Sequence, residues 1–92
     1  LRAGHTLIDI VRAKEPIAEA GSDSPGVDGR NLDHFCLRVD PFDGEAIRSH
    51  LRAHGTSPSN VATRYGADGY GPSIYVEDPE GNTVELKGPP SK

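Results

Sequence analysis

The sequence has few of the residues that fill a large hydrophobic core. Its 92 residues include no tryptophan, no methionine and only two phenylalanines, and 34% of them are hydrophobic. A chain of this length forms one small domain, and such a modest core is marginal for a domain that stands alone. We therefore expect a second copy of the chain, as a homodimer, or a missing N-terminal module to stabilise it.

Other absences exclude whole classes of protein. No apolar run approaches the roughly 18 residues of a transmembrane helix, so no membrane partner is expected. Cys36 is the only cysteine, which rules out an intrachain disulfide and fits a reducing, cytoplasmic location. The net charge is −4 and the lysines and arginines are scattered, so we expect no nucleic-acid partner.

The last third of the chain predicts a β-hairpin. Residues 74–76 are strong strand formers, and residues 83–86 alternate polar and apolar side chains. Between them, residues 78–82 have turn chemistry, with a proline that presets φ and Gly81 for a positive φ. Glu85 lies in the middle of the second strand, between two apolar residues, which marks it as a candidate functional carboxylate.

Residues 32–40 predict another strand of the same sheet. One face would carry Phe35, Leu37 and Val39, and the other His34, Cys36 and Arg38. The hairpin divides in the same way, with an apolar set (Ile74, Val76, Val84, Leu86) and a polar set (Ser73, Tyr75, Thr83, Glu85, Lys87). The alternation predicts one covered apolar face and one polar face on which His34 and Glu85 converge.

A helix is predicted over residues 44–54, with Asp43 as its N-cap and Gly55 after its end. Ile47 and Leu51 form a narrow apolar stripe that we expect to cover the apolar face of the sheet. A short strand at residues 61–65 then completes the order β-α-β-β-β.

Residues 5–13 also predict a strand, in which Asp9 interrupts an apolar run as Glu85 does. The chain begins within this hairpin and has no methionine, so we expect a fragment of a longer protein. The expected organisation is the last strand of an incomplete first module, a linker, a complete second module and a tail (residues 1–13, 14–31, 32–88 and 89–92).

The residue types on the polar face suggest a metal site. An imidazole and a carboxylate, from His34 and Glu85, suit a divalent ion such as Zn, Ni, Fe(II), Mn or Co. The alternative is structural: a histidine bonded to a backbone carbonyl and a glutamate paired with a lysine or arginine. Spacing alone leaves both open.

The chain resembles a known superfamily at these residues. His34 opening a strand, a helix, and then Gly-Pro-x-Ile-Tyr-Val-x-Asp-Pro-Glu-Gly-Asn-x-Val-Glu-Leu at residues 71–86 are similar to the vicinal-oxygen-chelate superfamily. That superfamily includes glyoxalase I, the bleomycin and fosfomycin resistance proteins and the extradiol dioxygenases. The resemblance covers residues 32–88 and implies an α+β fold of paired βαβββ modules, each with a mixed, curled sheet and a helix on one face.

The resemblance also implies a ligand set. His34 and Glu85 would bind the metal, and Asp9 would be a third ligand at the place where the first module usually has a glutamate. A fourth ligand would be a histidine on the first strand of the first module, which this sequence does not include.

The implied function is that of a metal-dependent enzyme acting on a small molecule. The metal would chelate vicinal oxygens of the substrate, and Glu85 or Asp9 would carry a proton in glyoxalase-like lyase or isomerase chemistry. Fe(II)-dependent extradiol ring cleavage is the other chemistry. Tyr75, Arg38 and Arg64 are candidates for substrate binding. The alternative function is metal-free small-molecule or antibiotic binding of the bleomycin-resistance type, for which 5% aromatic residues provide little cavity lining.

Overall fold

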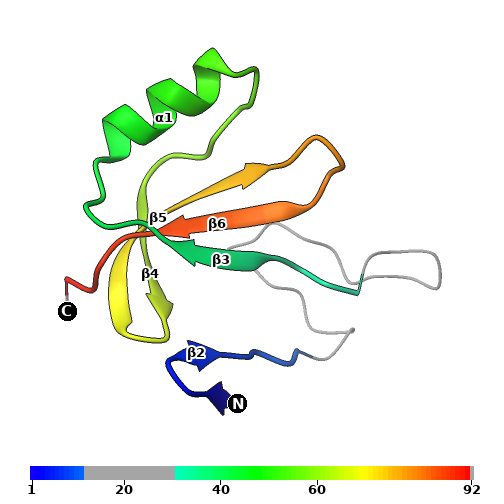
Figure 1. Cartoon of the computed structure of the whole chain (residues 1–92), viewed down its shortest axis with the longest axis vertical. Helices are drawn as coiled ribbons and strands as arrows, with labels where there is room; N and C mark the ends of the chain where they lie inside the picture. Colours follow the sequence, from blue (N-terminus) through cyan, green and yellow to red (C-terminus); the bar gives the residue numbers. More distant parts are fainter. Residues whose placement is uncertain (12–30, 92) are drawn as a thin grey trace.

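The computed structural model describes residues 1–11 and 31–91, which form a small α+β structure (Figure 1). Its elements are β1 (Arg2–Ala3), β2 (Thr6–Leu7), β3 (Phe35–Arg38), α1 (Gly44–Ala53), β4 (Ala62–Gly66), β5 (Gly69–Glu77) and β6 (Thr83–Lys87). The predicted order β-α-β-β-β is present from β3 to β6. Within the described ranges, no helix has the length and apolar character needed to span a membrane.

The main sheet is mixed and has the strand order β3-β6-β5-β4. β6 runs antiparallel to β5 and parallel to β3, while β5 and β4 form an antiparallel pair. The register places Cys36, Glu85 and Tyr75 side by side across three strands. Directly paired residues point to the same face, so the predicted division into an apolar and a polar set is confirmed.

The N-terminal segment forms a separate small hairpin, in which β1 pairs with β2 around a turn that contains Gly4 at φ +64°. The predicted strand over residues 5–13 is wrong for residues 8–11, which follow β2. Residues 8–11 are irregular, and Ile8 and Ile10 are 48% and 79% exposed. The hydrogen bonds between the backbones of Ile8 and Leu1, at 2.7 and 2.8 Å, close the small hairpin. Residues 12–13, and all of the predicted linker except Asn31, lie outside the described residues.

Local signals place the helix and the hairpin turn correctly. The Asp43 side chain accepts a hydrogen bond from the backbone N–H of Ala46 at 3.2 Å and so caps α1. The carboxylate of Asp78 accepts hydrogen bonds from the backbone N–H groups of Glu80 and Asn82, and Gly81 has φ +84°. These contacts fix the β5–β6 turn, and with it the register that positions Glu85.

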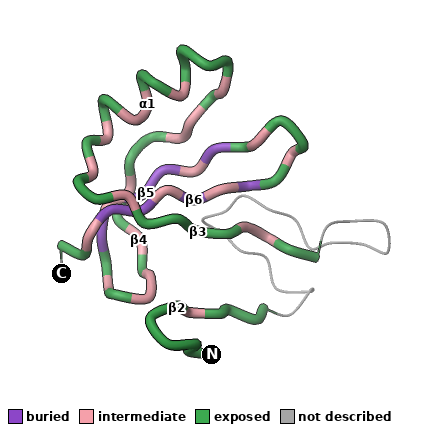
Figure 2. The backbone as a smooth tube through the Cα atoms, viewed as in Figure 1, coloured by how far each residue is buried: buried purple, intermediate pink, exposed green. Residues whose placement is uncertain are grey.

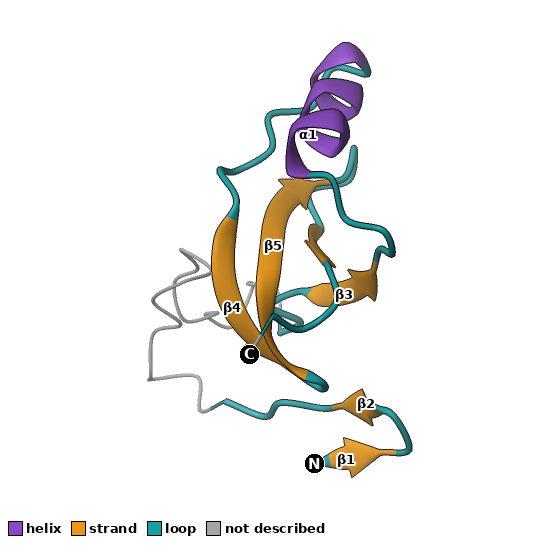
Figure 3. Cartoon of the chain, turned by 90° about the vertical axis from the view of Figure 1, so that its left-hand side faces the viewer, coloured by secondary structure: helices purple, strands orange, loops and turns teal. Residues whose placement is uncertain are grey.

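The apolar face of the sheet is covered only in part. Ile74 is fully buried, but Phe35 and Leu37 on β3 are 43% and 52% exposed. No residue of α1 is buried, and Figures 1 and 3 show the helix next to the end of β5 and away from β3. The expectation that the helix covers the apolar residues of β3 is therefore wrong, since β3 is an edge strand beyond its reach.

The polar face is the more buried face along β6. Thr83, Glu85 and Lys87 are buried there, whereas Val84 and Leu86 are only half-buried (Figure 2). The stem of Lys87 fits where glycines leave room, because a Cβ at Gly66 would lie 2.7 Å from its Cε. Its Nζ donates to the carbonyl of Gly69 at 3.1 Å. Polar side chains thus take part in the packing, and Glu85 lies among them.

Because the apolar face is covered unevenly, truncating its side chains should lower the free energy of unfolding by unequal amounts. Ile74→Ala should lower the free energy of unfolding by about 2–5 kcal/mol, because it empties a fully buried position. The matched change Leu37→Ala, on the same face, should cost about 1 kcal/mol or less, because half of that side chain already contacts water. Urea unfolding measures both, and equal losses would contradict the burial described above.

Candidate functional site

The candidate site is built around His34 and Glu85, which the pairing of β3 with β6 brings together. Cys36 is the register partner of Glu85, and His34 lies two residues earlier, on the same face. The Nε2 atom of His34 lies 3.1 Å from Oε1 of Glu85. Only 6% of the Glu85 side chain and 25% of the His34 side chain are exposed. The convergence predicted from strand phase is therefore present.

Asp33 holds the other side of the imidazole ring, at 2.6 Å between its Oδ2 and Nδ1 of His34. Strand alternation from Phe35 would place Asp33 on the opposite face, so the residue pattern did not single it out. β3 begins only at Phe35. Asp33 precedes the strand, so the direction of its side chain does not have to alternate with those of the strand residues. A carboxylate directly before the histidine was the available signal.

The pKa values of His34 and Glu85 shift in opposite directions, and each shift favours the charged form of the side chain. The hydrogen bond from His34 to Glu85 raises the pKa of the imidazole, against the opposing effect of burial, and Asp33 raises it further. Burial raises the pKa of Glu85, but the His34 hydrogen bond, the neighbouring Ser73 hydroxyl and the charge of Arg64 lower it by more. At neutral pH Glu85 is thus an ionised carboxylate.

Arg64 and Tyr75 extend this group across the sheet. The Nη1 atom of Arg64 donates to the backbone oxygen and the hydroxyl of Ser73, at 3.1 and 2.8 Å. The guanidinium lies 4.4 Å from the centroid of the Tyr75 ring, and that ring meets His34 edge to face at 5.2 Å. We call this set the histidine cluster: Asp33, His34, Arg64, Ser73, Tyr75 and Glu85.

One acceptor in the histidine cluster is not satisfied. Among the described residues, Oε2 of Glu85 is buried and has no hydrogen-bond partner. A buried carboxylate oxygen without a donor is unfavourable by about 1–3 kcal/mol or more, so such atoms in folded proteins usually face a ligand, an ion or a water molecule. The Ser73 hydroxyl and the Cys36 thiol also lie near this carboxylate, and Oε2 is available to accept from a ligand or to bind an ion.

Arg38 and Cys36, on the same polar face, are weaker candidates for binding or chemistry. Arg38, predicted to bind substrate, is half exposed and pairs with Asp68 at 2.6 Å and with Asp40 at 3.7 Å. Burial, and then the charge of Glu85, raise the pKa of the Cys36 thiol to about 11. The thiol is thus protonated at neutral pH, which makes it a poor nucleophile.

Asp9 is not part of the histidine cluster. It is exposed and lies in the irregular segment after β2. Among residues 1–11 and 31–91, no three histidine, cysteine, aspartate or glutamate residues are grouped so as to hold a metal ion. The chain therefore brings together two of its three predicted ligands, His34 and Glu85.

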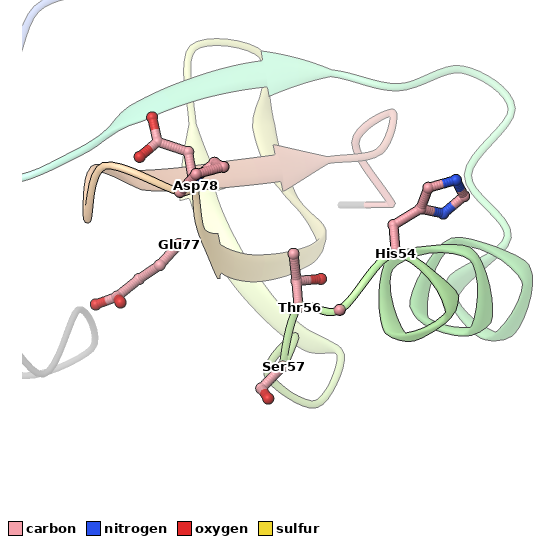
Figure 4. Close-up of a pocket in the computed structure, with 7 residues that line it drawn as sticks. His54, Thr56, Ser57, Glu77 and Asp78 are labelled. Atoms are coloured by element: carbon pink, nitrogen blue, oxygen red, sulfur yellow. The ribbon is translucent and has the colours of Figure 1, made fainter.

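An open pocket of about 440 Å³ lies elsewhere, between the end of α1 and the β5–β6 turn (Figure 4). Figure 4 shows His54 and Glu77 on opposite sides of it. The Asp78 carboxylate is occupied by Asn82, whose side chain and backbone N–H lower its pKa. Because its polar groups do not converge, this pocket is a weaker candidate than the histidine cluster.

Comparisons of the chain with family models, with curated proteins and with solved structures found no match. The superfamily resemblance thus rests on the residues of the chain itself, and it stays a prediction.

The opposite pKa shifts of His34 and Glu85 predict how stability depends on pH in the presence of a chelator. The unshifted values are 6.5 for the histidine and 4.5 for the glutamate. A raised histidine pKa stabilises the fold below pH 6.5, and this contribution is lost as the pH rises through the folded-state value. A lowered glutamate pKa stabilises it above pH 4.5, and this is lost as the pH falls through the folded-state value.

The free energy of unfolding should therefore be highest between these two values and should fall on the alkaline side. Urea unfolding across this range measures it. His34→Gln should flatten the alkaline fall, while His50→Gln, at an exposed position, should not. Stability that increases from pH 6.5 into the alkaline range would contradict the proposed pairing.

Proposed function

We propose that the chain contains a vicinal-oxygen-chelate-type module whose His34 and Glu85 bind a divalent metal ion and act on a small molecule with neighbouring oxygens. The metal would be Zn, Ni, Fe(II), Mn or Co. The chemistry proposed is of the glyoxalase lyase or isomerase type, with ring cleavage as the variant for Fe(II). The observation that carries the proposal is the contact of 3.1 Å between Nε2 of His34 and Oε1 of Glu85.

That distance suits two ligands of one ion. Ligand atoms at about 2.0–2.2 Å from a zinc-like ion, separated by an angle of about 90–110°, lie about 3.0–3.5 Å apart. The buried Oε2 of Glu85, without a donor among the described residues, adds a second free oxygen at the same place. A nitrogen and a carboxylate oxygen in this arrangement are the donors that these metals accept.

Further ligands have to come from outside the described residues. Two protein ligands are fewer than the three that a catalytic site of this kind normally has. β3, next to His34, is an edge strand whose four residues are exposed, so a further module can approach the site from that side. We propose that a second copy of the chain, or an N-terminal module, supplies the remaining ligands. Asp9 of the second copy stays a candidate.

The residues of the histidine cluster divide the chemistry between them. When bound, the metal would act as a Lewis acid on the vicinal oxygens of the substrate. Glu85 is ionised at neutral pH and has an oxygen that accepts no hydrogen bond from the described residues, so it can take up a proton. Arg64 is held by Ser73 beside Tyr75, where its charge can stabilise an anionic substrate.

Metal-free ligand binding is the second candidate function, and one observation favours it. A protonated His34 between Asp33 and Glu85, at 2.6 and 3.1 Å, satisfies both ring nitrogens without a metal ion. In that case the histidine cluster would bind a small molecule through hydrogen bonds from Tyr75 and Arg64. Metal content separates the two functions.

The test is metal binding by the purified chain and two variants. The wild type should bind about one Zn, Ni, Co, Mn or Fe(II) per subunit, measured by elemental analysis and by calorimetric titration after chelation. His34→Ala and Glu85→Gln should each weaken binding by about 100-fold or more, because each removes a ligand. Glu77→Gln is the matched control, since it removes an exposed carboxylate from the neighbouring strand.

Metal-free wild-type protein that cannot be reloaded would refute the metal-dependent function and favour the binding protein. Binding that persists unchanged in Glu85→Gln would remove Glu85 from the ligand set. The metal that is bound also separates the chemistries, because Fe(II) favours ring cleavage and Zn or Ni favours isomerisation.

A further inference from the structure

Asp33 lies at the outer nitrogen of His34 and has no role so far. It is part of the segment immediately before β3, and its side chain is 21% exposed. Its Oδ2 atom lies 2.6 Å from Nδ1 of His34, a shorter contact than the 3.1 Å between Nε2 and Glu85. The imidazole ring is thus held at both of its nitrogens by carboxylates.

The contact with Asp33 determines which nitrogen of a neutral ring carries the hydrogen. Both ring nitrogens face carboxylates, which accept hydrogen bonds and donate none. The contact at Nδ1 is the shorter one, at 2.6 Å against 3.1 Å at Nε2, so it holds the hydrogen of the neutral imidazole at Nδ1. The lone pair of the ring then lies on Nε2 and faces the Oε1 lone pairs of Glu85. Two acceptors 3.1 Å apart repel one another unless a cation binds between them.

Without Asp33, the ring has a simpler arrangement. The hydrogen would lie on Nε2, where it would donate to Glu85 and leave no electron pair free for a metal ion. Asp33 therefore opposes a purely structural hydrogen bond from His34 to Glu85.

We propose that Asp33 is the positioning residue of the metal site. It fixes His34 in the tautomer with hydrogen on Nδ1, orients the ring and makes Nε2 a stronger donor for the metal. This inference rests on the proposed function, in which His34 and Glu85 bind a divalent ion. Outer carboxylates of this kind typically strengthen metal binding by about 10–100-fold.

The experiment combines the ring tautomer with metal affinity. Two-bond proton–nitrogen NMR spectra of the metal-free full chain, at alkaline pH where the ring is neutral, report which nitrogen of His34 carries hydrogen. Zn²⁺ titration by calorimetry reports affinity. Asp33→Ala should move the hydrogen to Nε2 and weaken Zn²⁺ binding by about 10–100-fold.

Two further variants separate this role from a loss of structure. Asp33→Asn retains an oxygen that can accept from Nδ1, so it should keep the tautomer and lose less affinity than Asp33→Ala. Glu80→Gln removes a negative charge from an exposed position in the β5–β6 turn and should change the affinity by less than about twofold, because solvent screens that charge.

The possible failures are distinguishable. A wild type that binds no Zn²⁺ refutes the proposed function and the role of Asp33 together. A wild type that binds Zn²⁺ while Asp33→Ala binds equally well, with hydrogen still on Nδ1, refutes only the role of Asp33. A loss of affinity in Asp33→Ala without a change of tautomer also refutes it, because the loss would then have another cause.

Discussion

The parallel pairing of β3 with β6 is the contact on which the candidate site depends. His34 and Glu85 are 51 residues apart in the chain, and only this pairing brings their side chains within 3.1 Å. A parallel pair requires a long crossover, which here consists of α1 and the strands β4 and β5. The helix and the central strands therefore serve the site indirectly, by allowing the first and last strands of the main sheet to lie side by side.

The distribution of burial connects the site to the weak core. Glu85, Ser73 and Lys87 are among the most buried residues, although each is polar. The apolar side chains of β3, by contrast, remain about half exposed. The sheet thus buries the polar side chains of β6 and leaves the apolar side chains of its edge strand β3 open. The same edge is where the additional ligands of the proposed metal site would approach.

Much of the fold follows from local residue chemistry. Asp43 caps the helix and Gly81 supplies the positive φ of the hairpin turn, because both effects act over only a few residues. Alternation placed Tyr75 and Glu85 on one face, since the strand period is independent of context. The strand expected through Ile8 and Ile10 is absent at residues 8–11, because apolar alternation does not by itself extend pairing past the Leu1–Ile8 contact that closes the small hairpin.

The sequence by itself determined the order of the elements, the turns and the face on which His34 and Glu85 lie, because these depend on neighbouring residues and on strand period. Only the tertiary structure decided that the polar face is buried along β6, that Asp33 holds Nδ1 of His34 and that Arg64 lies over Tyr75. Those features depend on where a strand begins and on which strands lie side by side. Pairing between distant segments sets them, and no local pattern in the chain encodes it.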